Sequence, residues 1–359
     1  MRKIGIALGA LVGLASADAF QAGAVMLTIY PGAKAVGMGG AFTGIADDPT
    51  CMFYNLGGLG FFDRMELQLT HSPWLRTLVD DAYFDYFAGV FPTTVGNFGA
   101  SVTYLTPGEV EIYNENGDYL GAFKPFDVAV QLGYGFQPAK ALGVGFGFKV
   151  FYSYLIPDWV MRDILNEPGG GKALTVAVDG GLLYKTPLPG LSLGFNLANF
   201  GPGVSYSGEG QVDPLPWTLR LGLAWQVIRS EYHKLTIAAD WHKVLVGLFD
   251  DLSDRGINFV LDEGWRSVGA EYSLYDMLYL RYGYFHDRYG YRMGYTFGGG
   301  ISYGSFKLDI ADDSAIYEFN KHNPDVKRNL RFTLTFVKAV ALGGEAQEKP
   351  SSESIPGNE

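Results

Sequence analysis

Residues 32–59 read GAKAVGMGGAFTGIADDPTCMFYNLGGL and stand directly before a long series of alternating β segments. The stretch combines a glycine-dense segment with an Asp-Asp-Pro turn and a Tyr-Asn turn. Glycine allows a backbone to pack closely, while Asp, Asn and Pro favour tight turns. This order predicts a compact plug, or hatch, ahead of a β-barrel, and it favours a membrane barrel over a soluble β-sandwich. The predicted plug motif comprises Gly37, Met38, Gly39, Gly40, Asp47, Asp48, Pro49, Tyr54 and Asn55.

The segment from Leu142 to Tyr154 shows the strand pattern most clearly. Large apolar or aromatic residues occupy every second position, and most positions between them hold small or charged residues such as Gly143, Gly145 and Lys149. Successive side chains on a strand point to opposite faces, so one face of this strand is apolar. A run of about thirteen residues suits a tilted membrane strand better than a soluble strand, which usually has about five or six.

The same alternation recurs along the chain and predicts about fourteen strands, an even number as in bacterial outer-membrane barrels. Clusters of aromatic residues at strand ends resemble the girdles of such barrels. A soluble sandwich is the alternative, because a period of two does not by itself distinguish the two folds. Short turns alternate with long connections, which assigns the turns to the periplasm and the loops to the outside. The strands are expected to start near Met65, Ala82, Asn97, Phe126, Leu142, Leu174, Leu191, Trp217, Leu235, Arg266, Met277, Tyr291, Ser305 and Asn329.

The composition fits this fold and excludes some functions. Of the 359 residues, 48% are hydrophobic and 18% are charged, yet no run of about 18 apolar residues occurs, which excludes helical spans. Apolar residues dispersed at every second position suit a closed barrel. The formal net charge of −11 argues against a nucleic-acid partner. The predicted fold class is therefore all-β: a transmembrane antiparallel β-barrel of about fourteen strands, with the N-terminal plug in its lumen.

The chain divides into four predicted regions. Arg2 and Lys3 precede a short apolar run and small residues, which together predict a signal peptide at residues 1–17, cleaved after Ala17 or Ala19. The plug is expected over residues 18–63 and the barrel over residues 64–338. The polar tail at residues 339–359 should be disordered in the periplasm. The single cysteine, Cys51, is expected to be a buried thiol of the plug.

Charged residues on the small or polar strand faces are expected to line the lumen. A buried charge needs a partner, so these residues should form an ion network that holds the plug. One of the two plug aspartates is expected to cap a turn and the other to pair with a basic residue of the lumen, for which Lys149, Arg220 and Arg281 are the candidates. The predicted network comprises Lys149, Arg220, Asp240, His242 and Arg281.

Other chemical roles for these residues have weaker support. The glycine cluster lacks the following Lys-Ser/Thr of a phosphate-binding loop. Adjacent acids at Asp47 and Asp48 lack the spaced oxygen ligands of a calcium loop. Asp240 and His242 share a strand face, but no serine is aligned with them, which favours a lumen role over catalysis. The five histidines show no metal-ligand spacing, so neither a metal nor a cofactor is expected.

Four stretches of the sequence resemble the PorV/PorQ family, within the wider group of FadL-like barrels. They are residues 36–42 (VGMGGAF), 46–49 (ADDP), 183–194 (LYKTPLPGLSLG) and 213–222 (DPLPWTLRLG). Two features depart from the family pattern. Its Asn-Pro-Ala-Gly-Leu turn is replaced by Asn55-Leu56-Gly57-Gly58-Leu59, and a polar tail follows the last strand.

The resemblance implies a non-enzymatic barrel of the outer membrane with one of two roles. Members similar to PorV are components of type IX secretion, which receive exported proteins and pass them on for surface attachment. Members similar to FadL carry fatty acids or other hydrophobic compounds inward. A barrel hydrolase is a third, weaker hypothesis. The expected partners are membrane lipid, exported client proteins, secretion components and, on the second interpretation, hydrophobic small molecules. Aromatic residues assigned to outer loops as partner contacts are Trp74, Trp159, Tyr206, Phe249 and Trp265.

Overall fold

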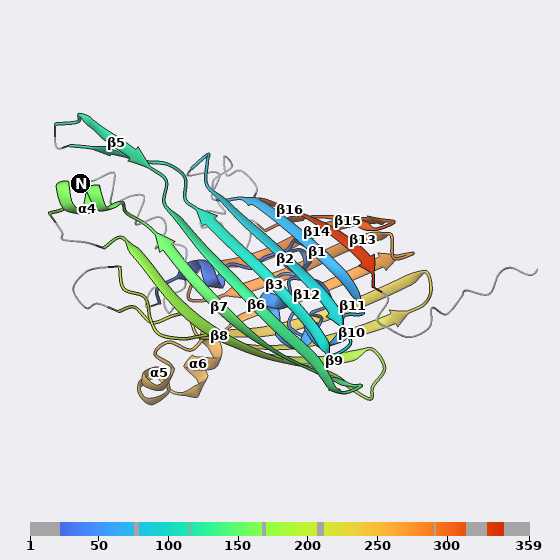
Figure 1. Cartoon of the computed structure of the whole chain (residues 1–359). Helices are drawn as coiled ribbons and strands as arrows, with labels where there is room; N and C mark the ends of the chain where they lie inside the picture. Colours follow the sequence, from blue (N-terminus) through green and yellow to red (C-terminus); the bar gives the residue numbers. More distant parts are fainter. Residues whose placement is uncertain are drawn as a thin grey trace, which may run out of the picture.

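The computed structural model describes residues 22–74, 79–114, 116–166, 170–206, 212–290, 292–313 and 329–340. The predicted signal peptide and residues 341–359 of the predicted tail lie outside these ranges. Within the described ranges, fourteen strands close into a barrel in the order β1-β16-β15-β14-β13-β12-β11-β10-β9-β8-β7-β6-β3-β2. Apart from the jump from β3 to β6, neighbours in the barrel are neighbours in the sequence, so the barrel is a meander closed by its first and last strands (Figure 1).

Each predicted strand start lies within two residues of the first residue of a barrel strand. The barrel strands are β1 (Arg64–Pro73), β2 (Tyr83–Thr93), β3 (Gly96–Thr106), β6 (Phe126–Ala139), β7 (Leu142–Tyr154), β8 (Lys172–Lys185), β9 (Leu191–Phe200), β10 (Thr218–Arg229), β11 (His233–Val244), β12 (Trp265–Leu274), β13 (Leu278–Asp287), β14 (Arg292–Tyr303), β15 (Phe306–Asp312) and β16 (Leu330–Ala339). The antiparallel pairing of β1 with β16 closes the barrel and leaves neither strand as a free edge, as a membrane requires.

The apolar face of the strands points outward. On β7, Phe146 and Phe148 are exposed, while Gly145, Gly147 and Lys149 between them are buried. Other barrel strands show the same alternation, so large apolar side chains cover the outside of the wall. A surface this apolar suits contact with lipid, as predicted.

Residues 22–62, termed the N-terminal segment, lie inside the barrel (Figure 1). This segment contains the short helices η2 (Val25–Thr28), α2 (Ala33–Gly37), α3 (Cys51–Tyr54) and η3 (Leu56–Phe61). Most of its residues are buried, and α2 packs against β13 to β16 while η3 packs against β6 to β8. The segment therefore fills the space between opposite walls.

Inward-facing glycines make room for this segment. A Cβ atom at Gly145 of β7 would lie 2.1 Å from the Leu56 carbonyl oxygen, and one at Gly283 of β13 would lie 2.2 Å from the Gly39 nitrogen. Both distances are shorter than any normal contact, so the backbones touch directly only because these positions lack a side chain. The alternation of large and glycine residues thus has two causes: lipid outside and packed backbone inside.

The connections also alternate as predicted, with short turns at one end of the barrel, the turn end, and long connections at the other, the loop end. Three of the long connections contain structure that the sequence analysis missed. These are the hairpin of β4 (Val110–Tyr113) and β5 (Tyr119–Phe123), the helix α4 (Asp158–Asp163), and the pair α5 (Leu248–Asp254) and α6 (Ile257–Glu263). In the part of the chain that the structure describes, the helices are all too short or too polar to span a bilayer.

Candidate functional site

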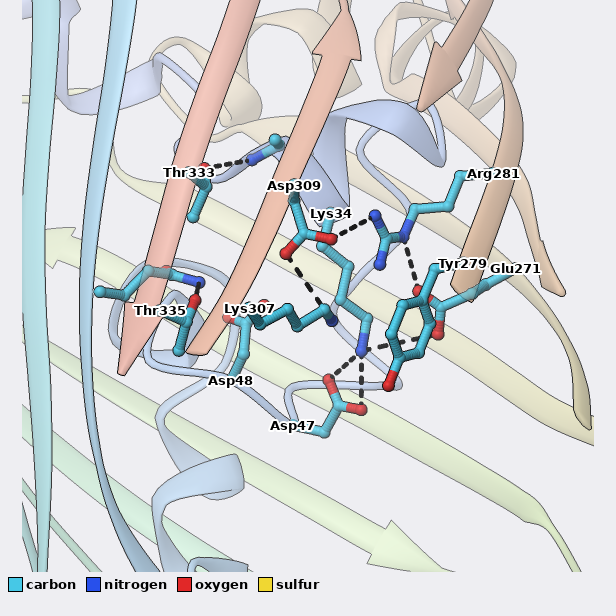
Figure 2. Close-up of polar contacts among 12 residues, drawn as sticks. Lys34, Asp47, Asp48, Glu271, Tyr279, Arg281, Lys307, Asp309, Thr333 and Thr335 are labelled. Carbon is cyan, nitrogen blue, oxygen red and sulfur yellow. Dashed lines mark hydrogen bonds and ion pairs between the residues drawn. The ribbon is translucent and has the colours of Figure 1, made fainter. Parts of the chain in front are cut away.

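The candidate site is the contact between the N-terminal segment and the inner wall. At its centre lies Lys34 of α2, whose Nζ is 2.7 Å from Asp47 Oδ1 and 3.7 Å from Glu271 Oε1 of β12 (Figure 2). Burial lowers the pKa of Lys34, but the carboxylates of Asp47, Glu271 and Asp48 outweigh it and raise the pKa well above its ordinary value. Lys34 therefore stays charged and links the segment to the wall.

The ion network continues from Glu271 along the wall. Arg281 of β13 donates from Nε to Glu271 Oε2 at 2.6 Å and from Nη1 to Asp309 Oδ1 of β15 at 2.7 Å. Lys307 Nζ lies 3.7 Å from Asp309 Oδ2. Three cations and three carboxylates thus alternate around the site, as Figure 2 shows. Buried charges persist only when paired in this way.

The two plug aspartates divide their roles as the sequence analysis expected, but with a different base. Asp48 Oδ1 accepts from the Thr50 nitrogen at 2.8 Å and from the Thr50 hydroxyl, so it caps the turn before α3. Burial raises the pKa of Asp48 despite these bonds and the nearby Lys34. Asp47 pairs with Lys34 of its own segment, not with Lys149, Arg220 or Arg281. The expected wall partner was wrong because Lys34, on α2 of the same segment, lies within 2.7 Å of the Asp47 carboxylate.

A second group of wall residues holds the segment from β10 and β11. Arg220 donates from Nη1 to the Phe53 carbonyl at 2.9 Å, and its guanidinium carbon lies 4.4 Å from the centre of the Phe53 ring. Asp240 Oδ2 accepts from the backbone nitrogens of Phe42 at 2.9 Å and Thr43 at 2.7 Å. His242 Nδ1 lies 2.7 Å from the Tyr30 hydroxyl. All three predicted residues therefore contact the N-terminal segment itself.

Lys149 belongs to neither group. Its Nζ lies 2.9 Å from Asp179 Oδ2 on the adjacent strand β8, and it borders a cavity of about 10 Å³ between the segment and the strands β2, β3, β6 and β7. The five predicted residues are thus all buried in the lumen, but they do not form one network. They stand on β7, on β10 and β11, and on β13, and alternation alone could not show which of these strands lie close together.

Asn55 of the predicted plug motif is also an anchor, and the sequence analysis missed several anchors on the wall. Asn55 donates to the carbonyls of Thr43 and Leu182, both at 2.9 Å, and accepts from Gly57, so it fixes the turn that departs from the family pattern. Wall residues that the strand alternation could have identified, because they share the polar face, are Glu271, Asp309, Arg331, Thr296 and Thr333. Of these, Thr333 accepts from the Ala33 nitrogen and Thr296 from the Gly39 nitrogen, each at 2.9 Å.

The plug motif also packs through its apolar residues. Met38 is completely buried, and Tyr54 donates from its hydroxyl to the Pro31 carbonyl at 3.0 Å. Gly39 and Gly40 adopt positive φ angles of 71° and 86°, which favour glycine at both positions. Pro49 lies in the turn that Asp48 caps.

The aromatic residues predicted as outer-loop contacts fall into three classes. Trp74 and Trp265 are buried inside the barrel, and Trp265 packs against the Tyr30 ring at 6.1 Å between centroids, so their assignment to an exposed loop surface was wrong. Both lie at strand ends, where the side chain turns into the lumen. Trp159 and Tyr206 are half-buried, and burial together with Asp127 raises the pKa of Tyr206 to about 12. Phe249 is exposed.

In the described residues, no group of three or more His, Cys, Asp or Glu side chains is placed to hold a metal ion. The geometry is that of a docking site for a segment of the same chain. Charged pairs, backbone hydrogen bonds and glycine contacts all join that segment to the wall.

A sequence model of the family described as type IX secretion system protein PorV matches residues 15–250, about two thirds of the chain. The chain belongs to the PorV family. No curated protein matches the chain. The coarse function follows from the family and the fold: this PorV-family protein is an outer-membrane barrel of type IX secretion.

Solved structures share the fold of this PorV-family chain. The toluene transporter TbuX of Ralstonia pickettii is 14% identical with a TM-score of 0.53, over 87% of this chain and 98% of TbuX. A mutant of the monoaromatic hydrocarbon channel TodX is 15% identical with a TM-score of 0.53, over 87% and 99%. These structures support the barrel architecture alone, since their sequence identity is low.

Proposed function

We propose that this protein is a docking or shuttle component for exported proteins in type IX secretion, and that it is not an enzyme. The loop end faces the cell exterior and the turn end faces the periplasm. The N-terminal segment acts as a plug that keeps the lumen closed, while clients and translocon partners bind the long connections. Trp159 and Tyr206, half-buried at the loop end, are the proposed contacts there.

The filled lumen is the observation that carries this proposal. The cavity beside the segment has a volume of only about 10 Å³, and its lining includes Lys149 and Gln131 together with apolar residues. A carrier of hydrocarbons needs an apolar path of ligand size, because binding sites for small molecules usually have volumes of about 300–1,000 Å³. The family match over two thirds of the chain points the same way.

The second candidate is a channel for long-chain fatty acids or other hydrophobic compounds. It is favoured by the fold shared with TbuX and with the TodX mutant, which are described as a toluene transporter and a hydrocarbon channel. On this proposal the plug moves to open the lumen. The docking sites at Lys34, Asp240 and Arg220 would then control conduction.

Deletion of the gene distinguishes the two candidates. The shuttle proposal expects surface proteins that share one C-terminal domain to be lost from the cell surface, with uptake of a labelled fatty acid unchanged. Complementation with the native protein should restore them. Normal surface proteins with reduced fatty-acid uptake would reverse the ranking. A variant with a weakened plug contact, Asp240→Ala, sharpens the test, because only a channel should then show faster uptake.

A further inference from the structure

The helices α5 and α6 lie outside the barrel wall at the loop end (Figure 1). Trp241 of β11 donates from Nε1 to the Leu261 carbonyl of α6 at 3.2 Å. Its neighbours Asp240 and His242 face the lumen, so Trp241 faces outward. The helix α6 is therefore fastened to the side of the wall that carries the apolar face.

Two arginines and one ion pair fix the helices in this position. Arg266, outward-facing on β12, donates from Nη2 to the Leu261 carbonyl at 3.2 Å and to Asp262 Oδ1 at 3.0 Å, and Arg288 also pairs with Asp262. Lys243 Nζ lies 2.6 Å from Glu263 Oε2, with only 1% and 3% of the two side chains exposed. Side chains alternate along a strand, and His242 of β11 faces the lumen, so the next residue, Lys243, faces outward. This ion pair therefore lies on the outer side of the wall, where the connection that contains α5 and α6 covers it.

The helices nevertheless leave large apolar side chains uncovered. Phe249 is 83% exposed and Leu252 is 44% exposed on α5, while Ile257 is 56% exposed and Leu261 is 48% exposed on α6. The spacings of three and four residues place the members of each pair on one helix face. Isolated exposed apolar residues are common on proteins. The helices α5 and α6 together form a short helical hairpin, termed the α5–α6 hairpin, and four such residues on one hairpin mark an interaction surface.

The depth of the hairpin identifies its partner. Trp241 is an outward tryptophan near the loop end of its strand, the position at which aromatic girdles meet the lipid headgroups. Phe200 and Trp217 stack at 4.9 Å at the same end of the neighbouring strands β9 and β10. A helix bound to Trp241 lies at the level of the headgroups, and its exposed apolar residues continue the lipid-facing surface of the wall.

We propose that the α5–α6 hairpin is an interfacial membrane anchor, with Phe249, Leu252, Ile257 and Leu261 inserted into the lipid leaflet at the loop end. The hairpin carries more acidic than basic residues: Asp250, Asp251, Asp254, Asp262 and Glu263 against Arg255. Attraction to anionic headgroups therefore does not drive the insertion, and apolar burial does. The anchor would hold this rim against the membrane whether the lumen conducts or not.

Depth-dependent quenching tests this proposal with the full-length mature chain in lipid nanodiscs. The background is Cys51→Ser, which removes the only native cysteine. Phe249→Cys and Ile257→Cys each carry an environment-sensitive fluorophore, and Ser253→Cys, an exposed polar position of α5, is the matched control. Spin-labelled phospholipids quench from the lipid side and iodide quenches from water. Heat-modifiable migration in gels verifies that each variant is folded.

The proposal expects the labels at Phe249 and Ile257 to be quenched several-fold more by spin-labelled lipid than the label at Ser253, and several-fold less by iodide. The pattern should not change when anionic lipid or salt is varied. Equal iodide quenching at all three positions would overturn the proposal. Labels that are water-accessible in nanodiscs but protected in native envelopes would also overturn it, and would assign the surface to a protein partner.

Discussion

At the scale of single residues, the wall holds the N-terminal segment by groups that bind its backbone. Asp240 is the clearest example, because one carboxylate oxygen accepts from two adjacent backbone nitrogens, those of Phe42 and Thr43. Charged hydrogen bonds of this kind each contribute about 1.5–3 kcal/mol. Loss of the carboxylate should leave two buried donors unpaired and weaken the docking of the segment.

Asp240→Ala is therefore expected to weaken docking by about 3 kcal/mol or more, which corresponds to an opening that is roughly 150-fold or more frequent. Cys51 reports the opening, since it is completely buried and burial raises the pKa of its thiol. Its rate of alkylation by a water-soluble maleimide should rise by that factor. The control is Asp127→Ala, since the Asp127 carboxylate binds Ser153 of the neighbouring strand. Equal alkylation of native protein and Asp240→Ala would contradict the role of Asp240.

The raised pKa of Lys34 gives a prediction for pH. Because its pKa is higher in the folded state than in the unfolded state, the stability that Lys34 contributes is fully present below about pH 10, the ordinary lysine range, and is lost only above it. The difference in unfolding free energy between native protein and Lys34→Met should thus stay constant from about pH 7 to about pH 10. A difference that shrinks within this window, measured by urea titration in detergent micelles, would show that Lys34 loses its charge earlier.

At the scale of elements, the positions of the strands were predictable from the sequence. The contacts that their inward-facing residues make in the lumen were predictable only in part. Period-two alternation located every barrel strand, because a wall between lipid and lumen demands opposite chemistry on its two faces. Alternation also placed Arg220, Asp240 and Arg281 inward. It could not show that Asp47 pairs with Lys34, or that α5 and α6 form in a loop, since the alternation describes strands and both features lie outside the strands.

Neighbouring glycines of β8 offer a matched test of the packed lumen. A Cβ atom at Gly181 would lie 2.4 Å from Asn55 Oδ1 and 2.7 Å from the Leu56 nitrogen, whereas one at Gly180 has its nearest neighbour at 3.9 Å. Gly181→Ala should displace the N-terminal segment at a cost of about 1–3 kcal/mol and speed the alkylation of Cys51. Gly180→Ala should change stability by no more than about 0.5 kcal/mol. Equal behaviour of the two variants would argue against direct contact at this wall.

At the scale of the whole molecule, the protein is a barrel whose two surfaces are specified separately. The outside is a continuous band of large apolar side chains, and the inside is glycine, paired charge and a folded segment of the same chain. Closure of β1 on β16 leaves no free strand edge. Both the shuttle and the channel proposals, and the membrane anchor, depend on the outer band meeting lipid.

Spin-label accessibility along β8 tests this dependence most directly. Single labels at residues 174–178, in nanodiscs and on the Cys51→Ser background, sample both faces of one strand, because Leu174, Val176 and Val178 are exposed while Thr175 and Ala177 are buried. Relaxation by oxygen, which concentrates in lipid, should be strong at residues 174, 176 and 178 and weak at 175 and 177. Relaxation by a water-soluble nickel complex should be low at the three outward positions. Strong relaxation by the nickel complex at those three positions, or uniform values along all five, would contradict the account.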